Sequence, residues 1–261
     1  MPMLQNKNIV IVGGTTGLGL SAALAFVRHE ARVVVVGRTD ATVQDAQRQL
    51  GDAGLALLGD ATREATAAEA IQQCADRWGG CHGLYHVAGG SGRRFGDGPL
   101  HNITLEGWNK TFELNLTSLM LSNQAAVRYF REQQHGGAIL NMGSVLGYSP
   151  SPQHFATHAY AATKSAIIGF TKAIAAHYAS DNIRVNVIAP ALVETPMAQR
   201  AANDDVIMKF IKTKQPLDGG RIGRPQDLDG LATCLLSDQT GFVTGQVVAV
   251  DGGWALSEGQ L

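Results

Sequence analysis

The stretch NIVIVGGTTGLGL, residues 8–20, decides the fold class of this chain. It begins with a short apolar run rich in β-branched residues, which is typical of a buried strand. Several glycines, among them Gly13, Gly17 and Gly19, follow before apolar residues recur at helical spacing. Glycine at such a turn lets the backbone approach a pyrophosphate, and the helix N-terminus behind it offers free amides. Tight strand-to-helix turns also collect glycine for conformational reasons alone, so the motif needs support from the rest of the chain.

That support comes from an alternation of strand and helix patterns that runs along the whole sequence. We predict further strands at 32–37, 54–59, 83–88, 137–143, 183–189 and 246–252. Helical patterns lie between them at 20–30, 41–51, 63–80, about 104–134 and 158–180. Such alternation is typical of right-handed βαβ units on a parallel sheet. We therefore predict a single doubly wound, Rossmann-type α/β domain over residues 1–261, with a seven-stranded parallel sheet and helices on both faces.

Three segments lack a regular pattern, and each follows the carboxyl end of a predicted strand. They are residues 91–102, 147–158 and 190–225. Ligands of doubly wound sheets bind beyond these strand ends. We expect the three segments to border a binding site, with 190–225 as the substrate loop.

Composition narrows the class of protein. The chain has 261 residues, 45% hydrophobic and 16% charged, which suits a globular domain. A formal charge of −1 and a pI near 6.7 argue against nucleic-acid or membrane-surface partners. Cys74, Cys81 and Cys234 form no CxxC pair, and no metal-ligand spacing is evident. With an N-terminal apolar run too short for a signal peptide, we predict a cytoplasmic protein without a metal.

The stretch HAYAATKSA, residues 158–166, carries the clearest candidate for chemistry. Tyr160 and Lys164 stand four residues apart, so on a helix they share one face. A phenol titrates near 10, and a neighbouring cation would bring it closer to neutral pH. The pair could also belong to an ordinary amphipathic helix. Ser144 after the strand at 137–143 and Asn115 in the preceding helix favour a catalytic interpretation.

The end of the second predicted strand bears on the cofactor. Gly37 is followed by Arg38, where an Asp or Glu would repel the 2′-phosphate of NADP. A guanidinium matches a phosphate, so NADP is favoured over NAD. Arg38 could instead be an exposed arginine that caps the sheet edge. Asp60, after the third strand, is placed to meet the adenine, although Asp is also common in such turns for local reasons.

At these residues the chain resembles the classical short-chain dehydrogenases/reductases over essentially its whole length. The family's TGxxxGxG is present as VGGTTGLG, its NNAG as HVAG, and its PG motif as Pro190 and Ala191 in APALVETP. The closing TGQxxxVDGG is present as TGQVVAVDGG. The family's catalytic tetrad falls on Asn115, Ser144, Tyr160 and Lys164.

The resemblance implies hydride transfer between a nicotinamide and a secondary alcohol or ketone. Tyr160 would be the general acid or base, and Ser144 would hold the same substrate oxygen. Lys164 would lower the pKa of Tyr160 and bind the nicotinamide ribose, while Asn115 would keep a kinked helix and an ordered water. The implied cofactor-binding residues are Gly13, Thr15, Thr16, Gly17, Leu18, Gly19, Arg38, Asp60, Ala61, Ala88, Gly89, Tyr160, Lys164, Pro190, Val193 and Thr195.

Several positions depart from the family pattern. Val12, His86, Val87 and Ala191 replace usual residues of its motifs, so we expect altered packing around a retained cofactor. The interval from Ser144 to Tyr160 is longer than usual, and the extra residues belong to the loop beside the substrate.

The irregular segments also hold candidate substrate-binding residues. Arg93 and Arg94 follow the fourth strand, and His154 lies in the loop after Ser144. A cleft bordered by arginines could hold an acidic or highly hydroxylated substrate. Such loop residues are more often simply solvated, so both interpretations stay open.

Two alternatives to the leading hypothesis remain at this stage. One is the same chemistry with NAD on a sugar or hydroxy-acid substrate. The other is a nucleotide-binding sensor or scaffold without catalysis, because residue identity alone does not establish a reaction. The two long helices resemble the pair through which the family assembles, which implies a homotetramer or homodimer.

Overall fold

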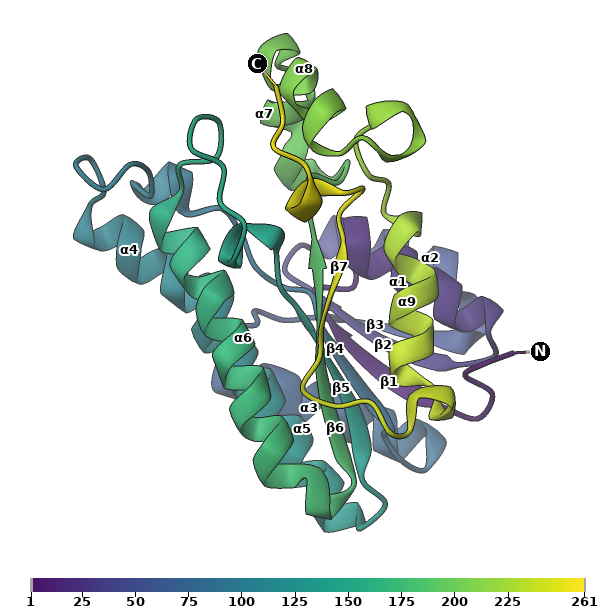
Figure 1. The fold of residues 1–261 in the computed structure, drawn as a ribbon. Coiled ribbons are helices and arrows are strands. Elements are labelled where there is room, and N and C mark those ends of the chain that lie inside the picture. Colours follow the sequence, from purple (N-terminus) through teal and green to yellow (C-terminus); the bar gives the residue numbers. More distant parts are fainter. Residues whose placement is uncertain (1, 261) are drawn as a thin grey trace.

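Seven parallel strands form one sheet in the computed structural model, which describes residues 2–260 (Figure 1). They are β1 (Asn8–Val12), β2 (Arg32–Gly37), β3 (Gly54–Leu58), β4 (Gly83–His86), β5 (Gly137–Met142), β6 (Ile183–Pro190) and β7 (Val247–Val250). The strand order is β3-β2-β1-β4-β5-β6-β7, so the direction of winding reverses between β1 and β4. The predicted single doubly wound domain is confirmed, and its switch point leaves a crevice at the carboxyl ends of the strands.

Helices cover both faces of this sheet (Figure 1). One face carries α1 (Gly17–Arg28), α2 (Asp40–Leu50) and α9 (Gln226–Leu236); the other carries α3 (Glu64–Trp78), α5 (Ser118–Gln133) and α6 (His158–Tyr178). Alternate residues of a strand point to opposite faces. Thus Ile9 packs in the cluster of Phe26 from α1, and Val10 packs in the cluster of Ile71 from α3. Burial on both faces explains why the strands are almost continuously apolar.

The helix expected at 104–134 is interrupted. It consists of α4 (Leu105–Phe112), a π-helical turn over Glu113–Thr117, and α5. Asn115 stands within the turn and donates a hydrogen bond from Nδ2 to the Thr111 carbonyl at 2.8 Å. Such π-turns often occur at functional sites, because they turn a side chain away from the regular helical ladder.

The expectation that 190–225 is irregular is wrong for its middle part. It contains α7 (Gln199–Ala202) and α8 (Asp205–Lys214), and α9, which follows it, was also not predicted. Asp204 caps α8 by accepting hydrogen bonds from the amides of Val206 and Ile207 at 3.0 and 3.1 Å. Because Ile207, Phe210 and Ile211 then bury one face, this segment is a folded cover over the carboxyl ends of the strands.

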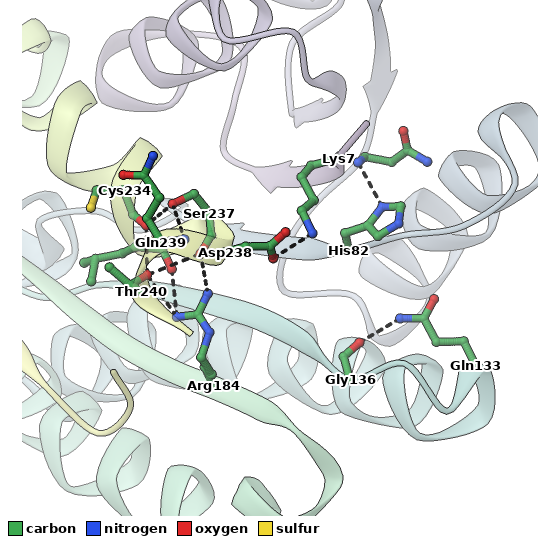
Figure 2. A network of polar contacts seen from close by, with 12 residues as sticks. Lys7, His82, Gln133, Gly136, Arg184, Cys234, Ser237, Asp238, Gln239 and Thr240 are labelled. Atoms are coloured by element: carbon green, nitrogen blue, oxygen red, sulfur yellow. Dashed lines mark hydrogen bonds and ion pairs between the residues drawn. The ribbon is translucent and has the colours of Figure 1, made fainter. Parts of the chain in front are cut away.

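A polar network holds the opposite, amino-terminal end of the sheet together (Figure 2). Arg184 of β6 donates hydrogen bonds to the carbonyls of Leu235 and Ser237 at 3.0 and 3.1 Å, which satisfies groups left free where α9 ends. Lys7, just before β1, forms an ion pair with Asp238 at 2.8 Å. This end is fixed by structural contacts, and the carboxyl end is left for binding.

No helix within residues 2–260 has both the length and the apolarity needed to cross a membrane. The three cysteines are free thiols, and Cys74 and Cys81 are buried.

Candidate active site

A cavity of about 550 Å³ runs along the carboxyl ends of the strands, a volume typical of small-molecule sites. All four candidate catalytic residues line it: Asn115, Ser144, Tyr160 and Lys164. Every candidate cofactor-binding residue lines it as well, with the exception of Gly19. The fold therefore brings together residues that are separated by more than a hundred positions in the sequence.

Tyr160 and Lys164 project from successive turns of α6 toward this cavity. The Lys164 ammonium lies 5.4 Å from the centre of the Tyr160 ring, and its Nζ donates a hydrogen bond to the Met142 carbonyl at 2.8 Å. That carbonyl belongs to the last residue of β5, so the bond ties α6 to the strand that leads into Ser144. The spacing of the pair had predicted a shared face, and the structure places both on it.

The loop after β5 fixes the position of Ser144. Its Oγ accepts a hydrogen bond from the Leu146 amide at 3.2 Å, which caps a short 3-10 turn at 145–147. A Cβ on Gly147 would lie only 2.8 Å from the main-chain carbon of Lys164, so glycine lets this turn pack directly against α6. The serine and the Tyr160–Lys164 pair are thus held as one rigid unit.

Asn115 faces the glycines that follow β4. Its Oδ1 accepts a hydrogen bond from the Gly90 amide at 3.1 Å, and its Nδ2 donates to the Gly90 carbonyl at 2.8 Å. A Cβ on Gly89 would approach Asn115 Oδ1 to 2.7 Å. The side chain that breaks the helical ladder therefore also positions the backbone of Gly89 and Gly90 at the cavity wall.

Asp97 is a positioning residue that sequence patterns did not reveal. Helix α6 has no capping side chain of its own, and Asp97 supplies the cap from the segment after β4. Its two carboxylate oxygens accept hydrogen bonds from the amides of Ala159 and Tyr160, both at 3.0 Å. The side chain is buried, and a carboxylate at a helix N-terminus is favoured by the helix dipole. No local motif signals a cap from 62 positions away.

Burial has the largest effect on the pKa values of Tyr160 and Lys164. It raises the pKa of Tyr160 to about 12, and the nearby Ser144 hydroxyl acts in the opposite direction. Burial also lowers the pKa of Lys164 to about 7, because a charged ammonium loses its hydration. The hydrogen bond with Ser144 lowers the pKa of Tyr160, but burial has the larger effect. With a pKa of about 12, the Tyr160 hydroxyl is neutral at neutral pH.

His86 occupies a position where the family pattern has asparagine. It is fully buried, with Nδ1 3.0 Å from the Ser122 hydroxyl and Nε2 3.4 Å from the Ser118 hydroxyl of α5. Burial, and secondarily the charge of Lys164, lower the pKa of His86 to about 3. A neutral histidine thus contacts the helix just after the π-turn.

The glycine turn is shaped to accept a phosphate group. Gly13 has φ +88°, and a Cβ there would lie 2.6 Å from the Ala88 nitrogen. Helix α1 begins without a capping side chain and without an acidic residue in its first turn, so its first amides remain available to an anion. Gly19 lies outside the lining because it packs against the Gly13 carbonyl, where a Cβ would collide. These features fit the pyrophosphate of a dinucleotide.

Arg38 and Asp60 stand at the far end of the cavity, beyond β2 and β3. Arg38 is exposed, and its charge contributes to a lowered pKa of Asp60, after the hydrogen bond from the Thr62 amide. Asp60 Oδ1 accepts that bond at 3.0 Å and a second one from the Thr62 hydroxyl at 2.9 Å. Both residues line the cavity, and no acidic residue other than Asp60 does so within residues 2–260.

The candidate substrate residues separate into two groups. Arg93 lines the cavity, whereas Arg94 and His154 do not. Arg94 lies over the Phe95 ring at 4.7 Å, and the His154 ring packs on Phe210 with centroids 5.0 Å apart. Other residues of the lining carried no sequence signal and come from three separate segments: Leu146, Phe155, Met197, Arg200 and Trp254.

The part of the chain that the structure describes contains no cluster of side chains typical of a metal site. Residues 2–260 contain no group of three or more histidine, cysteine, aspartate or glutamate side chains positioned to hold an ion. The polar side chains of the cavity are mainly hydroxyls, an amide and cations, with Asp60 as the one carboxylate within residues 2–260.

A doubly wound sheet with this glycine turn and this tyrosine, lysine and serine at its carboxyl edge defines the class of Rossmann-fold oxidoreductases. A family model described as Enoyl-(Acyl carrier protein) reductase matches residues 12–255. The chain belongs to the short-chain dehydrogenase/reductase family, and it is an oxidoreductase for substrates of the alcohol or ketone type. The resemblance predicted from the motifs is thereby confirmed.

Particular relatives are similar over nearly their whole length. "2-(S)-hydroxypropyl-CoM dehydrogenase 3" of Xanthobacter autotrophicus is 34% identical, with 96% of this chain and 97% of that protein covered. "Inactive 2-(S)-hydroxypropyl-CoM dehydrogenase 2" of the same organism is 35% identical, with 88% and 98% covered. A solved short-chain type dehydrogenase/reductase from Mycobacterium ulcerans superposes with a TM-score of 0.88 at 29% identity, with 98% and 92% covered.

Proposed function

We propose that this protein is an NADP(H)-dependent oxidoreductase that interconverts a secondary alcohol and a ketone, with Tyr160 as the general acid and base. One observation carries the proposal: Tyr160, Ser144 and Lys164 open onto the same cavity that passes the glycine turn and ends at Arg38. The cofactor, when bound, supplies or accepts the hydride. The chain supplies the position of the substrate and the proton.

In the direction of reduction, the neutral Tyr160 hydroxyl donates its proton to the substrate oxygen. Ser144 donates a hydrogen bond to the same oxygen and holds it within reach of that proton. Lys164 binds ribose hydroxyls and, in its charged form, favours the tyrosinate that remains. Because burial lowers the pKa of Lys164 to about 7, its charged form is much less favoured than that of an exposed lysine. Asn115 acts indirectly, because it holds Gly89 and Gly90 in place.

The turnover test is a panel of neutral ketones, oxo acids, sugars and secondary alcohols, offered with NADPH, NADH or the oxidised forms. Absorbance of the reduced nicotinamide reports the reaction. We expect turnover of at least one ketone or secondary alcohol, faster with NADP(H). A nucleotide-binding sensor without catalysis would bind NADPH but turn over none of the panel. The name of the inactive relative shows why this alternative must be tested directly.

Arg38 makes the preference for NADP(H) testable. Arg38→Ala should raise the KM for NADPH by about 10- to 100-fold, because a charge-assisted bond to the 2′-phosphate is lost. The KM for NADH should change by less than about threefold. Arg32→Ala is the matched control, since Arg32 is also exposed and stands at the other end of β2. If Arg38→Ala leaves the ratio of the two KM values unchanged, the same chemistry with NAD(H) becomes the better assignment.

Assembly into a homodimer or homotetramer is part of the proposal. A second groove lies between α5 and α6, and its apolar lining includes Val127, Phe170 and Ile174. A second copy of the chain would cover these side chains. We expect light scattering after size exclusion to give a multiple of 27.6 kDa, and Phe170→Glu to lower it. A single-chain mass for the unaltered protein would contradict the assembly.

We further propose a cytoplasmic location, in keeping with the three free thiols.

A further inference from the structure

Two arginines from different segments face the substrate end of the cavity. Arg93 belongs to the 3-10 turn Gly92–Phe95 after β4, and Arg200 belongs to α7 after β6. Arg200 Nη2 reaches the His154 carbonyl at 3.5 Å, in the loop that follows Ser144. Arg200 therefore stands on the side of the cavity where that loop and Tyr160 meet, whereas Arg38 stands at the other end, beyond β2.

Neither guanidinium has an acidic partner. Within residues 2–260 no carboxylate lies within ion-pair distance of Arg93 or Arg200. Asp97 is the acidic group that acts on Arg93, yet both of its oxygens already accept amide hydrogen bonds from the start of α6. The pKa of Arg93 is lowered mainly because burial removes part of its hydration, and to a smaller extent by the charge of Arg200. Two cations that disfavour each other therefore line one cavity, and neither forms an ion pair with a carboxylate of residues 2–260.

The surroundings of the pair are apolar and aromatic. Phe155, Met197 and Trp254 line the same end of the cavity, and Trp254 is anchored by a hydrogen bond from its Nε1 to the Ser149 carbonyl at 3.0 Å. An apolar wall strengthens an ionic interaction by excluding water from it. This combination of a short apolar wall and a pair of guanidinium groups suits a ligand with a small carbon skeleton and a charged end.

We propose that Arg93 and Arg200 together bind an anionic group of the substrate, so that the substrates are oxo acids and the corresponding hydroxy acids. The inference rests on the proposed function, because it places the reacting carbon at Tyr160 and the anion at the arginine pair. A carboxylate is the simplest such group, and a sulfonate or phosphate would offer the same bidentate oxygens. The anion would supply the ion-pair partner that neither guanidinium has within residues 2–260.

Pairs of substrates that differ only in charge test this inference. The 2-, 3-, 4- and 5-oxo acids are compared with their methyl esters in the presence of NADPH. We expect at least one acid to exceed its ester in kcat/KM by about 10- to 100-fold, mostly through KM. Arg93→Gln and Arg200→Gln should each remove most of this preference. Arg94→Gln is the control from the same turn, since its side chain lies outside the cavity lining.

The cofactor is a second possible source of anionic groups, and the same variants distinguish it. If Arg93→Gln and Arg200→Gln raise the KM for NADPH by tenfold or more and leave the acid preference intact, the arginines bind the cofactor and the inference is overturned. Equal kcat/KM for acids and esters also overturns it, while the proposed reaction stands.

A binding assay separates failure of the inference from failure of the proposed reaction. Should no compound be turned over, the proposed function fails on its own. Calorimetric titration of the oxo acids and esters into the protein with NADP then decides the inference. Acid-selective binding that the double variant loses supports it, and binding without regard to charge contradicts it.

Discussion

Tyr160→Phe should lower kcat by about 10²- to 10⁴-fold, the range that loss of a general acid usually produces. The phenylalanine ring fills the same space on α6, so the fold and the cavity stay as they are. Only the hydroxyl is removed, and with it the proton that the substrate oxygen must receive. The high pKa of Tyr160, about 12, makes it a donor that remains protonated across the neutral range.

The measurement is the single-turnover rate with the best substrate of the panel, together with the Kd for NADPH from fluorescence. We expect the Kd to change by less than about threefold, which separates chemistry from binding. Tyr148→Phe is the matched control, because Tyr148 is 44% exposed and lies outside the cavity lining. If Tyr160→Phe retained the rate of the unaltered protein, the proposed mechanism would be wrong.

Lys164→Met should remove activity and yet raise stability, which is the second large effect. Lys164 is 3% exposed, and burial lowers its pKa from 10.5 to about 7. Between these two pH values the unfolded chain holds a proton at this lysine that the folded chain releases. The free energy of unfolding therefore rises with pH from about 7 to 10.5, and a buried lysine destabilises the fold most at the lower end.

Methionine removes that cost while filling a similar volume. It also leaves the Met142 carbonyl without its hydrogen bond from Nζ, and this loss offsets about 1 kcal/mol of the gain in the free energy of unfolding. We expect a net gain of roughly 1–3 kcal/mol in the free energy of unfolding at pH 7, and this gain should shrink toward pH 10. Activity should fall by at least about 10²-fold, since the charge beside the tyrosinate and the ribose contact are both lost.

Urea unfolding at several pH values measures the stability effect, and initial rates measure the activity. Lys172→Met on the exposed face of the same helix is the control. We expect it to leave both the free energy of unfolding and the initial rate nearly unchanged. If Lys164→Met instead lowered the free energy of unfolding at pH 7 by about the value of one hydrogen bond, burial of Lys164 would not destabilise the fold.

Much of the site could be predicted because its signals are local. The spacing of Tyr160 and Lys164 fixes a shared helix face, and the glycines at 13–19 report a backbone turn that side chains would obstruct. The structure brings both to one cavity with Ser144 and Asn115. Tyr160→Phe and Lys164→Met test whether the residues of this cavity perform the proposed chemistry.

The remaining features of the fold and of the site could not be predicted, because they depend on contacts between segments that are distant in the sequence. Helix α8 was missed, since Asp204 and the buried face of Ile207 and Phe210 were obscured by the proline- and glycine-containing ends of the segment 190–225. Of the predicted substrate residues, Arg94 and His154 point elsewhere, although they are close in sequence to residues that line the cavity. Arg200 carried no local signal at all.

The sequence by itself determined the seven strands, most of the helices between them, the glycine turn and the shared face of Tyr160 and Lys164, because periodicity and spacing act over a few residues. The candidate tetrad as a whole came from the resemblance of several motifs to one family. Tertiary structure alone decided that Asp97 caps α6, that Arg93 and Arg200 share a cavity, and that burial makes Tyr160 a weak acid and Lys164 a weak base. Hydration, charge and capping depend on which groups surround a side chain in space, and only the packed fold sets those surroundings.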